Sequence, residues 1–225
     1  MQHNIKNKPD FASLHIGLDR GESIVTESGA MMAMTTELDL QTNLKGGLLG
    51  AAKRALGGES LFLNTYTATD DGQQLDLAPS APGDIEHLPL AARSVMVQSG
   101  SYLCAGPGVE VDTKWGGART FFGGEGLFML RCSGPGDLWI SSYGAIHPVD
   151  VNGSYVVDTG HIVAFEDTLQ FQVKSVGGLK SLLFSSEGLV CEFNGRGRLW
   201  LQTRNSSALA AFLHPFRRVQ PKNDS

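Results

Sequence analysis

The sequence predicts an all-β fold, a double-stranded β-helix or β-prism with threefold internal repetition and a short C-terminal helix. Three observations support this prediction. Glycine makes up 28 of the 225 residues, or 28/225 = 12% against a usual share of about 7%, and it punctuates short β-favouring runs. Residues 169–174 alternate strictly between apolar and polar side chains, which is the period of a half-buried strand. Related blocks of sequence also recur three times, as they do in repeat architectures.

The recurring blocks predict the domain organisation. One block places a glutamate after two small residues and before an apolar run, at residues 57–62, 123–128 and, with serines in place of the glycine pair, 185–190. A second block, with a small hydroxyl residue and a glycine, precedes each glutamate at residues 28–31, 99–102 and 159–162. Units of about 60 residues suit small β modules around a pseudo-threefold axis. We therefore expect a single domain, with boundaries at 1–220 for the domain, about 11–90, 91–150 and 151–205 for the repeats, and 221–225 for a tail.

Local patterns predict the individual strands and helices. The β-favouring runs occupy residues 127–131, 138–141, 190–193 and 199–203. Glycine-rich segments at 133–136 and 194–197 separate these runs in pairs and predict hairpin turns. Apolar residues at helical spacing predict helices at 44–56 and 206–216. We expect Ser206 and Ser207 to cap the second helix and Pro215 to end or kink it early.

Composition excludes several classes of protein. Lys and Arg number 18 against 23 Asp and Glu, so the net charge is −5 and nucleic acid is not an expected partner. Charged residues at 18% and apolar residues at 41% exclude a disordered chain. The sequence lacks both the roughly 18 consecutive apolar residues of a membrane span and the apolar core of a signal peptide. Cys104, Cys132 and Cys191 form no CxxC pair, so we expect buried thiols in a cytoplasmic protein.

Longer strings resemble a widespread, mostly uncharacterised bacterial family. They include FFGGEGLFMLRCSGPGDLWISSYG at 121–144, VDTGHIVAFE at 157–166 and EGLVCEFNGRGRLWLQTR at 187–204. In this order they are similar to the family related to the "altered inheritance of mitochondria" biogenesis proteins, over about residues 21–212. The resemblance implies an all-β fold like that of the tryptophan RNA-binding attenuator, and eukaryotic relatives linked to mitochondrial inner-membrane organisation. It implies no catalytic residues, and RNA binding does not transfer with a fold.

Three glutamates are the first candidates for a site. Glu59, Glu125 and Glu187 fall at matching places in the repeats. They either converge on a hard cation through oxygen ligands or each accept hydrogen bonds within their own turn. We favour the second interpretation, because a repeated structure also demands repeated residues.

Asp158, His161 and Glu166 form the second candidate group, since a histidine beside carboxylates is a minimal general-base arrangement. No GxSxG elbow or evident catalytic cysteine accompanies them, so we favour a histidine that is hydrogen-bonded within a strand. The six histidines contain no HxH or HExxH pair, and residues 46–53 do not fit the phosphate-loop pattern. The sequence therefore predicts no catalytic residue and no cofactor, and it leaves metal binding open.

The leading functional hypothesis is a non-enzymatic, self-associating scaffold or binding module. A homo-oligomer is expected because exposed strand edges need covering. One alternative is a small-ligand or metal-binding protein, or an enzyme, that uses Glu125, Glu187, Asp158 and His161 in a cleft. Another is peripheral membrane association through residues 44–56, which we do not favour because this segment contains few basic residues. The tryptophans are expected in the core or an interface: Trp115, Trp139 and Trp200.

Overall fold

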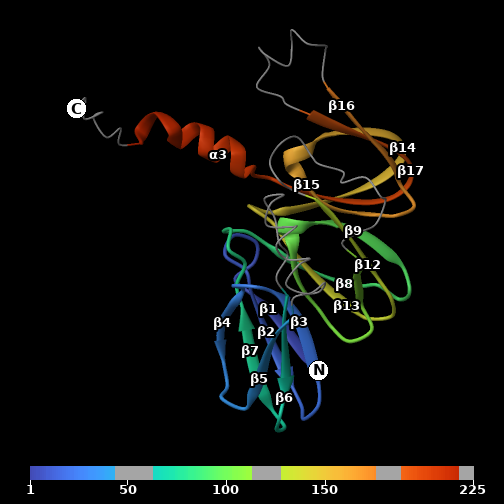
Figure 1. Ribbon diagram of the computed structural model, residues 1–225. Coiled ribbons are helices and arrows are strands. Elements are labelled where there is room, and N and C mark those ends of the chain that lie inside the picture. Colours follow the sequence, from blue (N-terminus) through green and yellow to red (C-terminus); the bar gives the residue numbers. More distant parts are fainter. Residues whose placement is uncertain (44–62, 113–127, 176–188, 218–225) are drawn as a thin grey trace, which may run out of the picture.

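Antiparallel β-strands dominate the fold, which confirms the all-β prediction (Figure 1). The computed structural model describes residues 1–43, 63–112, 128–175 and 189–217. The strands are β1 (Gln2–Lys6), β2 (Ser13–Leu18), β3 (Ser23–Glu27), β4 (Met31–Met34), β5 (Leu38–Asn43), β6 (Leu63–Ala68), β7 (Gln73–Leu77), β8 (Ile85–Pro89), β9 (Ser94–Gln98), β10 (Tyr102–Ala105), β11 (Glu110–Asp112), β12 (Met129–Ser133), β13 (Asp137–Ser141), β14 (Ile146–Asp158), β15 (Ile162–Glu166), β16 (Gln170–Ser175) and β17 (Leu189–Gln202).

These strands form three curled sheets. Their strand orders are β1-β2-β7-β4, β5-β6-β3-β10-β13-β8 and β11-β12-β9-β15-β17-β14, with β16 also paired to β17. The second and third sheets each combine strands from two separate stretches of the chain. The pairing of β3 with β10 joins the two halves of the second sheet, and the pairing of β9 with β15 does so in the third. Successive parts of the chain are therefore held together by backbone ladders as well as by side-chain packing.

Most of the predicted strands are confirmed. The alternating segment at 169–174 corresponds to β16, and the runs at 127–131 and 138–141 correspond to β12 and β13. The glycine-rich segment at 133–136 joins β12 to β13, as predicted for a hairpin turn. Gly134 has a φ of +117°, which residues with a side chain rarely adopt.

The turn predicted at 194–197 is wrong, because β17 runs unbroken from Leu189 to Gln202. It pairs with β14 residue by residue in one long antiparallel ladder. Gly195 lies opposite Gly153, and both have a positive φ, of 122° and 114°. Glycine adopts this conformation without steric cost, so the pair accommodates a local distortion within a continuous ladder instead of reversing the chain.

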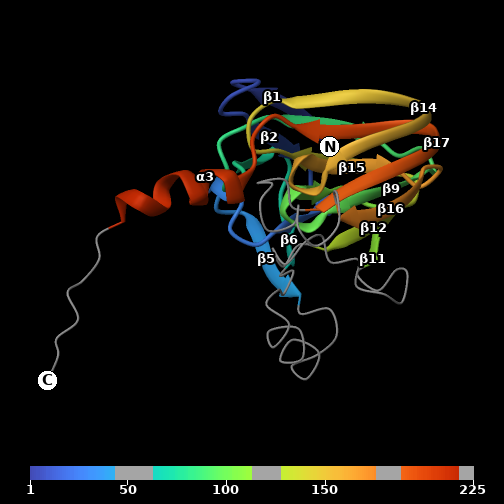
Figure 2. The same cartoon turned by 90° about the horizontal axis from the view of Figure 1, so that it is seen from above.

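The predicted C-terminal helix is confirmed as α3 (Ser206–Leu213), and a 3₁₀ turn that contains Pro215 follows it. The cap differs from the prediction. The Asn205 side chain, and not a serine, accepts hydrogen bonds from the backbone N–H groups of Ser207 (2.9 Å) and Ala208 (3.3 Å). The capping residue must keep extended backbone geometry just before the helix, and Asn205 does so. No α3 side chain is buried, and the helix projects away from the sheets (Figure 2).

Buried apolar residues form three clusters that follow the sheets. The first includes Leu14, Leu75 and Trp139, the second lies around Val97 and Leu130, and the third contains the ring contacts of Phe165, Phe171 and Phe193. Trp139 and Trp200 both belong to this core, as predicted, with exposed fractions of 0% and 4%. Trp115 lies outside the described residues.

The blocks at 28–31, 99–102 and 159–162 share a structural irregularity. Their last residues begin β4, β10 and β15. Each of these strands shifts register against its neighbour between its first and third residues, at Met31/Ala33, Tyr102/Cys104 and Ile162/Ala164. The three glutamates of the other block and the helix predicted at 44–56 lie outside the described residues. Threefold repetition stays a prediction.

Candidate functional site

Asp158 directly precedes a short 3₁₀ helix, η2 (Thr159–His161), and His161 is its last residue. The Asp158 carboxylate accepts a hydrogen bond from the Gly160 N–H at 2.8 Å and caps this helix. The His161 Nδ1 atom lies 2.7 Å from the carbonyl oxygen of Gln202, and the Gln202 side-chain amide donates to the Gly160 carbonyl at 2.9 Å. These hydrogen bonds fasten η2 to β17, so both predicted residues have structural partners.

Glu166 lies apart from these two residues, at the end of β15. Its carboxylate accepts from the Arg198 N–H at 2.9 Å and from Arg93 at 3.0 Å. In the described part of the chain, no hydrogen bond joins Glu166 to Asp158 or His161. The described residues also hold no group of three or more His, Cys, Asp or Glu side chains arranged to bind a metal ion. Glu59, Glu125 and Glu187 lie outside the described residues, so their convergence stays a prediction.

A hydrogen-bonded Ser–His–Asp chain, which the sequence did not predict, crosses the outer face of the first sheet. Ser13 Oγ lies 3.0 Å from His15 Nε2, and His15 Nδ1 lies 2.8 Å from Asp76 Oδ1. Ser13 and His15 share one face of β2 because they are two residues apart, and His15 is directly opposite Asp76 on β7. The carboxylate fixes the orientation of the imidazole, whose other nitrogen meets the hydroxyl, as in a general-base relay.

An open groove of about 270 Å³ runs beside this chain. Side chains of β1, β2 and β7 line it, including Gln2, Lys6, His15, Gln74 and Asp76. The lining is rich in amide and charged groups, which suits a small polar molecule more than an apolar one.

A second histidine cluster packs against Trp139. His87 Nε2 lies 2.7 Å from Asp137 Oδ1, and the His87 ring stacks on Trp139 with centroids 5.0 Å apart. The His3 ring lies 4.3 Å from that of His87. Burial, followed by the neighbouring His87, lowers the pKa of His3, and Asp137 opposes this shift. These contacts attach β1 to the second sheet, so we assign the cluster a structural role.

Glu27, at the end of β3, is a half-buried carboxylate. Within the described residues, no hydrogen bond or ion pair reaches its carboxylate. Burial raises the pKa of Glu27 from its ordinary value of 4.5 to about 7. Its charge in turn contributes to the raised pKa values of the buried Tyr102 hydroxyl and Cys104 thiol, for which burial is the main cause.

We expect Glu27→Gln to flatten the pH dependence of stability. The folded state holds the Glu27 proton up to about pH 7, whereas the unfolded state releases it near 4.5. Stability is therefore lost as the pH rises between these values. At pH 8 the variant is expected to be more stable than wild type by at most about 3 kcal/mol, with a small difference at pH 5. Urea unfolding at both pH values tests this, with the exposed Glu37→Gln as the control; equal pH slopes for Glu27→Gln and wild type would contradict it.

The cysteines are buried free thiols, as the sequence predicts. Burial raises the pKa of Cys104 well above its ordinary value and raises the pKa of Cys132 and Cys191 to about 12. Because the thiolate is the reactive form, these cysteines are poor nucleophiles at neutral pH.

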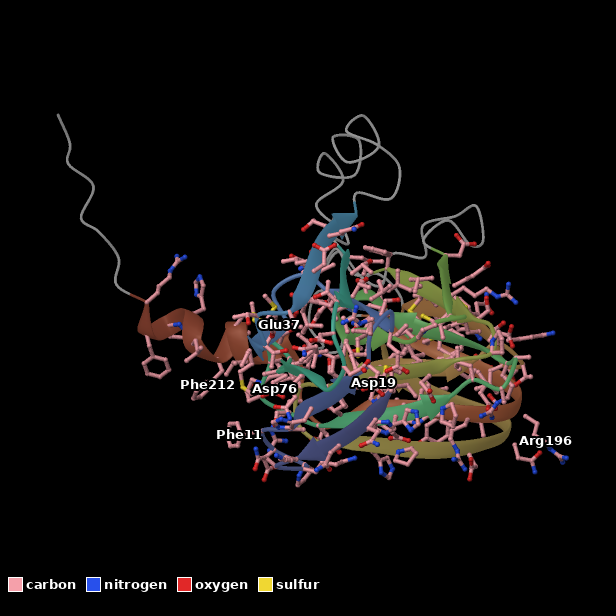
Figure 3. The ribbon with its side chains drawn as sticks, turned by 90° about the horizontal axis from the view of Figure 1, so that it is seen from below. Phe11, Asp19, Glu37, Asp76, Arg196 and Phe212 are labelled. Carbon is pink, nitrogen blue, oxygen red and sulfur yellow. The ribbon has the colours of Figure 1, made fainter. Side chains whose placement is uncertain are left out.

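The most distinctive surface feature is a pair of strand edges that have no neighbouring strand among the described residues and that expose apolar side chains. β4 ends the first sheet and exposes Met31, Met32 and Met34 by 41%, 53% and 40%. Residues 153–157 of β14 pair with β17 on one side only, and they expose Tyr155 by 39% and Val156 by 58%. Helix α3 adds the exposed side chains of Leu209, Phe212 and Leu213, and the 3₁₀ turn after it adds Phe216. Figure 3 shows Phe212 pointing away from the sheets, on the same side of the molecule as Phe11.

Comparison with known proteins identifies the family. A sequence profile of the mitochondrial biogenesis AIM24 family matches residues 3–204. The chain belongs to the AIM24 family. An uncharacterised protein of Streptococcus pyogenes serotype M6 is 28% identical over 223 residues, which cover 95% of this chain and 90% of that protein. A crystal structure of a Streptococcus pyogenes protein, also 28% identical, superposes with a TM-score of 0.83 and covers 96% of this chain and 99% of its own.

The described helices of this AIM24 family member include none that is long and apolar enough to cross a bilayer. Two of its structural features were missed by sequence reasoning for the same reason. The His15–Asp76 contact joins residues 61 positions apart, and the unpaired edges appear only once strand order is known. The only local feature of the sequence that pointed to these edges was the lack of charged residues in β4 and in residues 153–157.

Proposed function

We propose that this AIM24 family member is a non-enzymatic scaffold or binding module that associates with copies of itself. The observation that supports this most strongly is the chemistry of its sheet edges. β4 and residues 153–157 of β14 contain neither a charged residue nor a proline. Edges of this kind, whose outward N–H and C=O groups have no strand partner among the described residues and whose apolar side chains are exposed, are templates for pairing with another chain.

The other exposed edges carry the residues that discourage pairing. β5 contains Asp39, β11 begins with Glu110 and β16 contains Lys174. β8 ends the second sheet and contains Glu86 and Pro89, and β1 ends the first sheet and contains Lys6.

β14 is an edge of the third sheet along its whole length, and outside residues 153–157 it contains Pro148, Asp150 and Asp158. Charges and prolines at an edge raise the cost of adding a strand. Pairing is therefore directed to β4 and to the uncharged part of β14, residues 153–157, which we call the two uncharged edges.

Helix α3 supplies further apolar surface for assembly. It projects on the side of the molecule where β4 lies (Figures 1 and 2). A copy that docks on β4 approaches the exposed side chains of this helix, and contiguous apolar surface of this kind marks interaction sites.

Sedimentation velocity of the wild-type protein over a dilution series tests this proposal. We expect a mass of more than one chain that decreases on dilution, because association follows mass action. A single-chain mass at every concentration up to the solubility limit would contradict self-association.

An enzyme or small-ligand function is the second candidate, and the Ser13–His15–Asp76 chain beside the groove favours it. Ser13 is only 7% exposed, which limits access of a substrate to its hydroxyl. Labelling by a fluorophosphonate that is lost in Ser13→Ala would support this candidate, whereas equal labelling of both proteins would count against it. The attenuator-like fold and a cytoplasmic location are further proposals; the curled antiparallel sheets and the buried free thiols support them.

A further inference from the structure

We infer that the two uncharged edges pair with each other head to tail, β4 of one copy with residues 153–157 of β14 of the next. This inference rests on the proposed self-association and specifies its geometry. The partner is a second copy of the chain because the chain already contains two junctions of the same kind.

We call the pairings of β3 with β10 and of β9 with β15 the internal junctions. Both are antiparallel. In each junction, the first strand comes just before one repeated block, and the second strand comes just after the next block. β3 precedes block 28–31 and pairs with β10, which follows block 99–102. β9 precedes block 99–102 and pairs with β15, which follows block 159–162. Two strands are left over in this scheme. β4 follows the first block, and the end of β14 precedes the third block. Among the described strands, neither has a partner on its outer edge.

The irregularities of the strands support this equivalence. β4, β10 and β15 each begin at the last residue of their block and each shift register after the first residue. β4 therefore has the local geometry of the two strands that already form junctions. It differs from them because no described strand of the same chain pairs with its outer edge.

The internal junctions also predict the register between copies. In the third sheet Ala164 lies opposite Val97, and Phe165 lies opposite Met96. Counting from the blocks, Ala33 and Met34 correspond to Ala164 and Phe165, while Val157 and Val156 correspond to Val97 and Met96. We therefore expect three residue pairs between copies, which are Ala33 with Val157, Met34 with Val156, and Thr35 with Tyr155.

Burial at the corresponding positions shows what pairing would change. Met96 and Phe165 are 0% and 1% exposed within their junction, whereas Val156 and Met34 are 58% and 40% exposed. Met32 is 53% exposed, and its counterparts Leu103 and Val163 are both fully buried. The free edges thus carry apolar side chains at positions that are buried wherever the junction is complete. Burial of such side chains is the main favourable term in association.

Pairing between different edges produces a heterologous contact. Each copy then offers one edge of each kind, so assembly continues until a ring closes or a filament grows. An isologous dimer, in which β4 meets β4 or β14 meets β14, would leave the other edge uncovered.

Variants blocked at one edge distinguish these arrangements. Met34→Lys blocks β4 and leaves β14 intact, while Val156→Lys does the reverse, because a charge directed into a new junction disfavours pairing. We expect each variant alone to sediment as a single chain and an equimolar mixture to form a two-chain species without further growth. Leu40→Lys, at an exposed position on the β5 edge, is the matched control and is expected to assemble as wild type does.

Several outcomes would overturn the inference. Dimers formed by either variant alone would indicate an isologous contact, and a monomeric mixture beside an assembling wild type would exclude pairing of the two intact edges. A monomeric wild type would instead contradict the proposed function itself. Circular dichroism melts verify that each variant is folded, and Met32→Lys and Tyr155→Lys replace any variant that is not.

Discussion

A protein carrying both Met34→Cys and Val156→Cys is expected to form a ladder of covalent multimers under mild oxidation. In the proposed junction these residues lie directly opposite one another on the same face. Opposed residues of an antiparallel pair have Cβ atoms about 4.5–5.5 Å apart, which is close to the separation that a disulfide needs. The native cysteines do not compete, because all three are buried with raised pKa values. Non-reducing electrophoresis measures the outcome.

A second double variant, in which one cysteine is moved by one residue along β14, tests the register of the proposed pairing. In Met34→Cys with Tyr155→Cys, the second cysteine lies on the opposite face of the strand, because side chains alternate along a strand. We expect it to give little covalent multimer under the same conditions. Equal ladders from both double variants would contradict the proposed register, and so would the absence of a ladder in the first.

Trp139→Ala is expected to have the largest effect on stability. Trp139 is fully buried and contacts the rings of His3 and His87. Removing a large aromatic side chain from a core typically costs about 3–5 kcal/mol. For a chain of this size the midpoint of thermal unfolding should decrease by roughly 6–20 °C, which calorimetry can measure. A loss below about 1 kcal/mol would contradict the assignment of Trp139 to a tightly packed core.

A conservative pair of variants separates packing from hydrogen bonding. The Trp139 indole N–H has no hydrogen-bond partner among the described residues, whereas the Trp200 N–H donates to Glu86 at 3.0 Å. Trp139→Phe therefore loses only volume, while Trp200→Phe also removes the donor to a carboxylate. We expect Trp200→Phe to lower the free energy of unfolding more than Trp139→Phe does, because it leaves the Glu86 carboxylate without this donor; urea unfolding of both variants measures the difference.

The local features of the fold could be predicted from sequence because they depend on neighbouring residues. The alternation at 169–174 predicted β16, the glycines at 133–136 predicted the turn after β12, and Pro215 predicted the early end of α3. The turn predicted at 194–197 failed because glycine permits both a reversal and a distorted ladder, and the pairing of Gly195 with Gly153 decides between them. That pairing is a contact between distant parts of the chain, which local pattern does not specify.

The candidate sites also divide into those that depend on neighbouring residues and those that depend on contacts between distant residues. The sequence drew attention to Asp158 and His161 because they lie close together, and the structure gives each a backbone partner. It missed the Ser13–His15–Asp76 chain, whose members meet only through the register of β2 and β7. The two edges proposed for association could not be predicted either. Only the strand order of the whole sheet shows which uncharged strands lie at an edge.

Hydrogen–deuterium exchange at two protein concentrations is the most direct test of assembly through these edges. Pairing gives partners to the outward-facing N–H groups of β4 and of residues 153–157, so their exchange should slow in the assembled protein and recover on dilution. The β5 edge serves as the internal reference and should exchange equally at both concentrations. If the mass increases with concentration while exchange in β4 and at residues 153–157 stays constant, the protein associates through another surface and the account is contradicted.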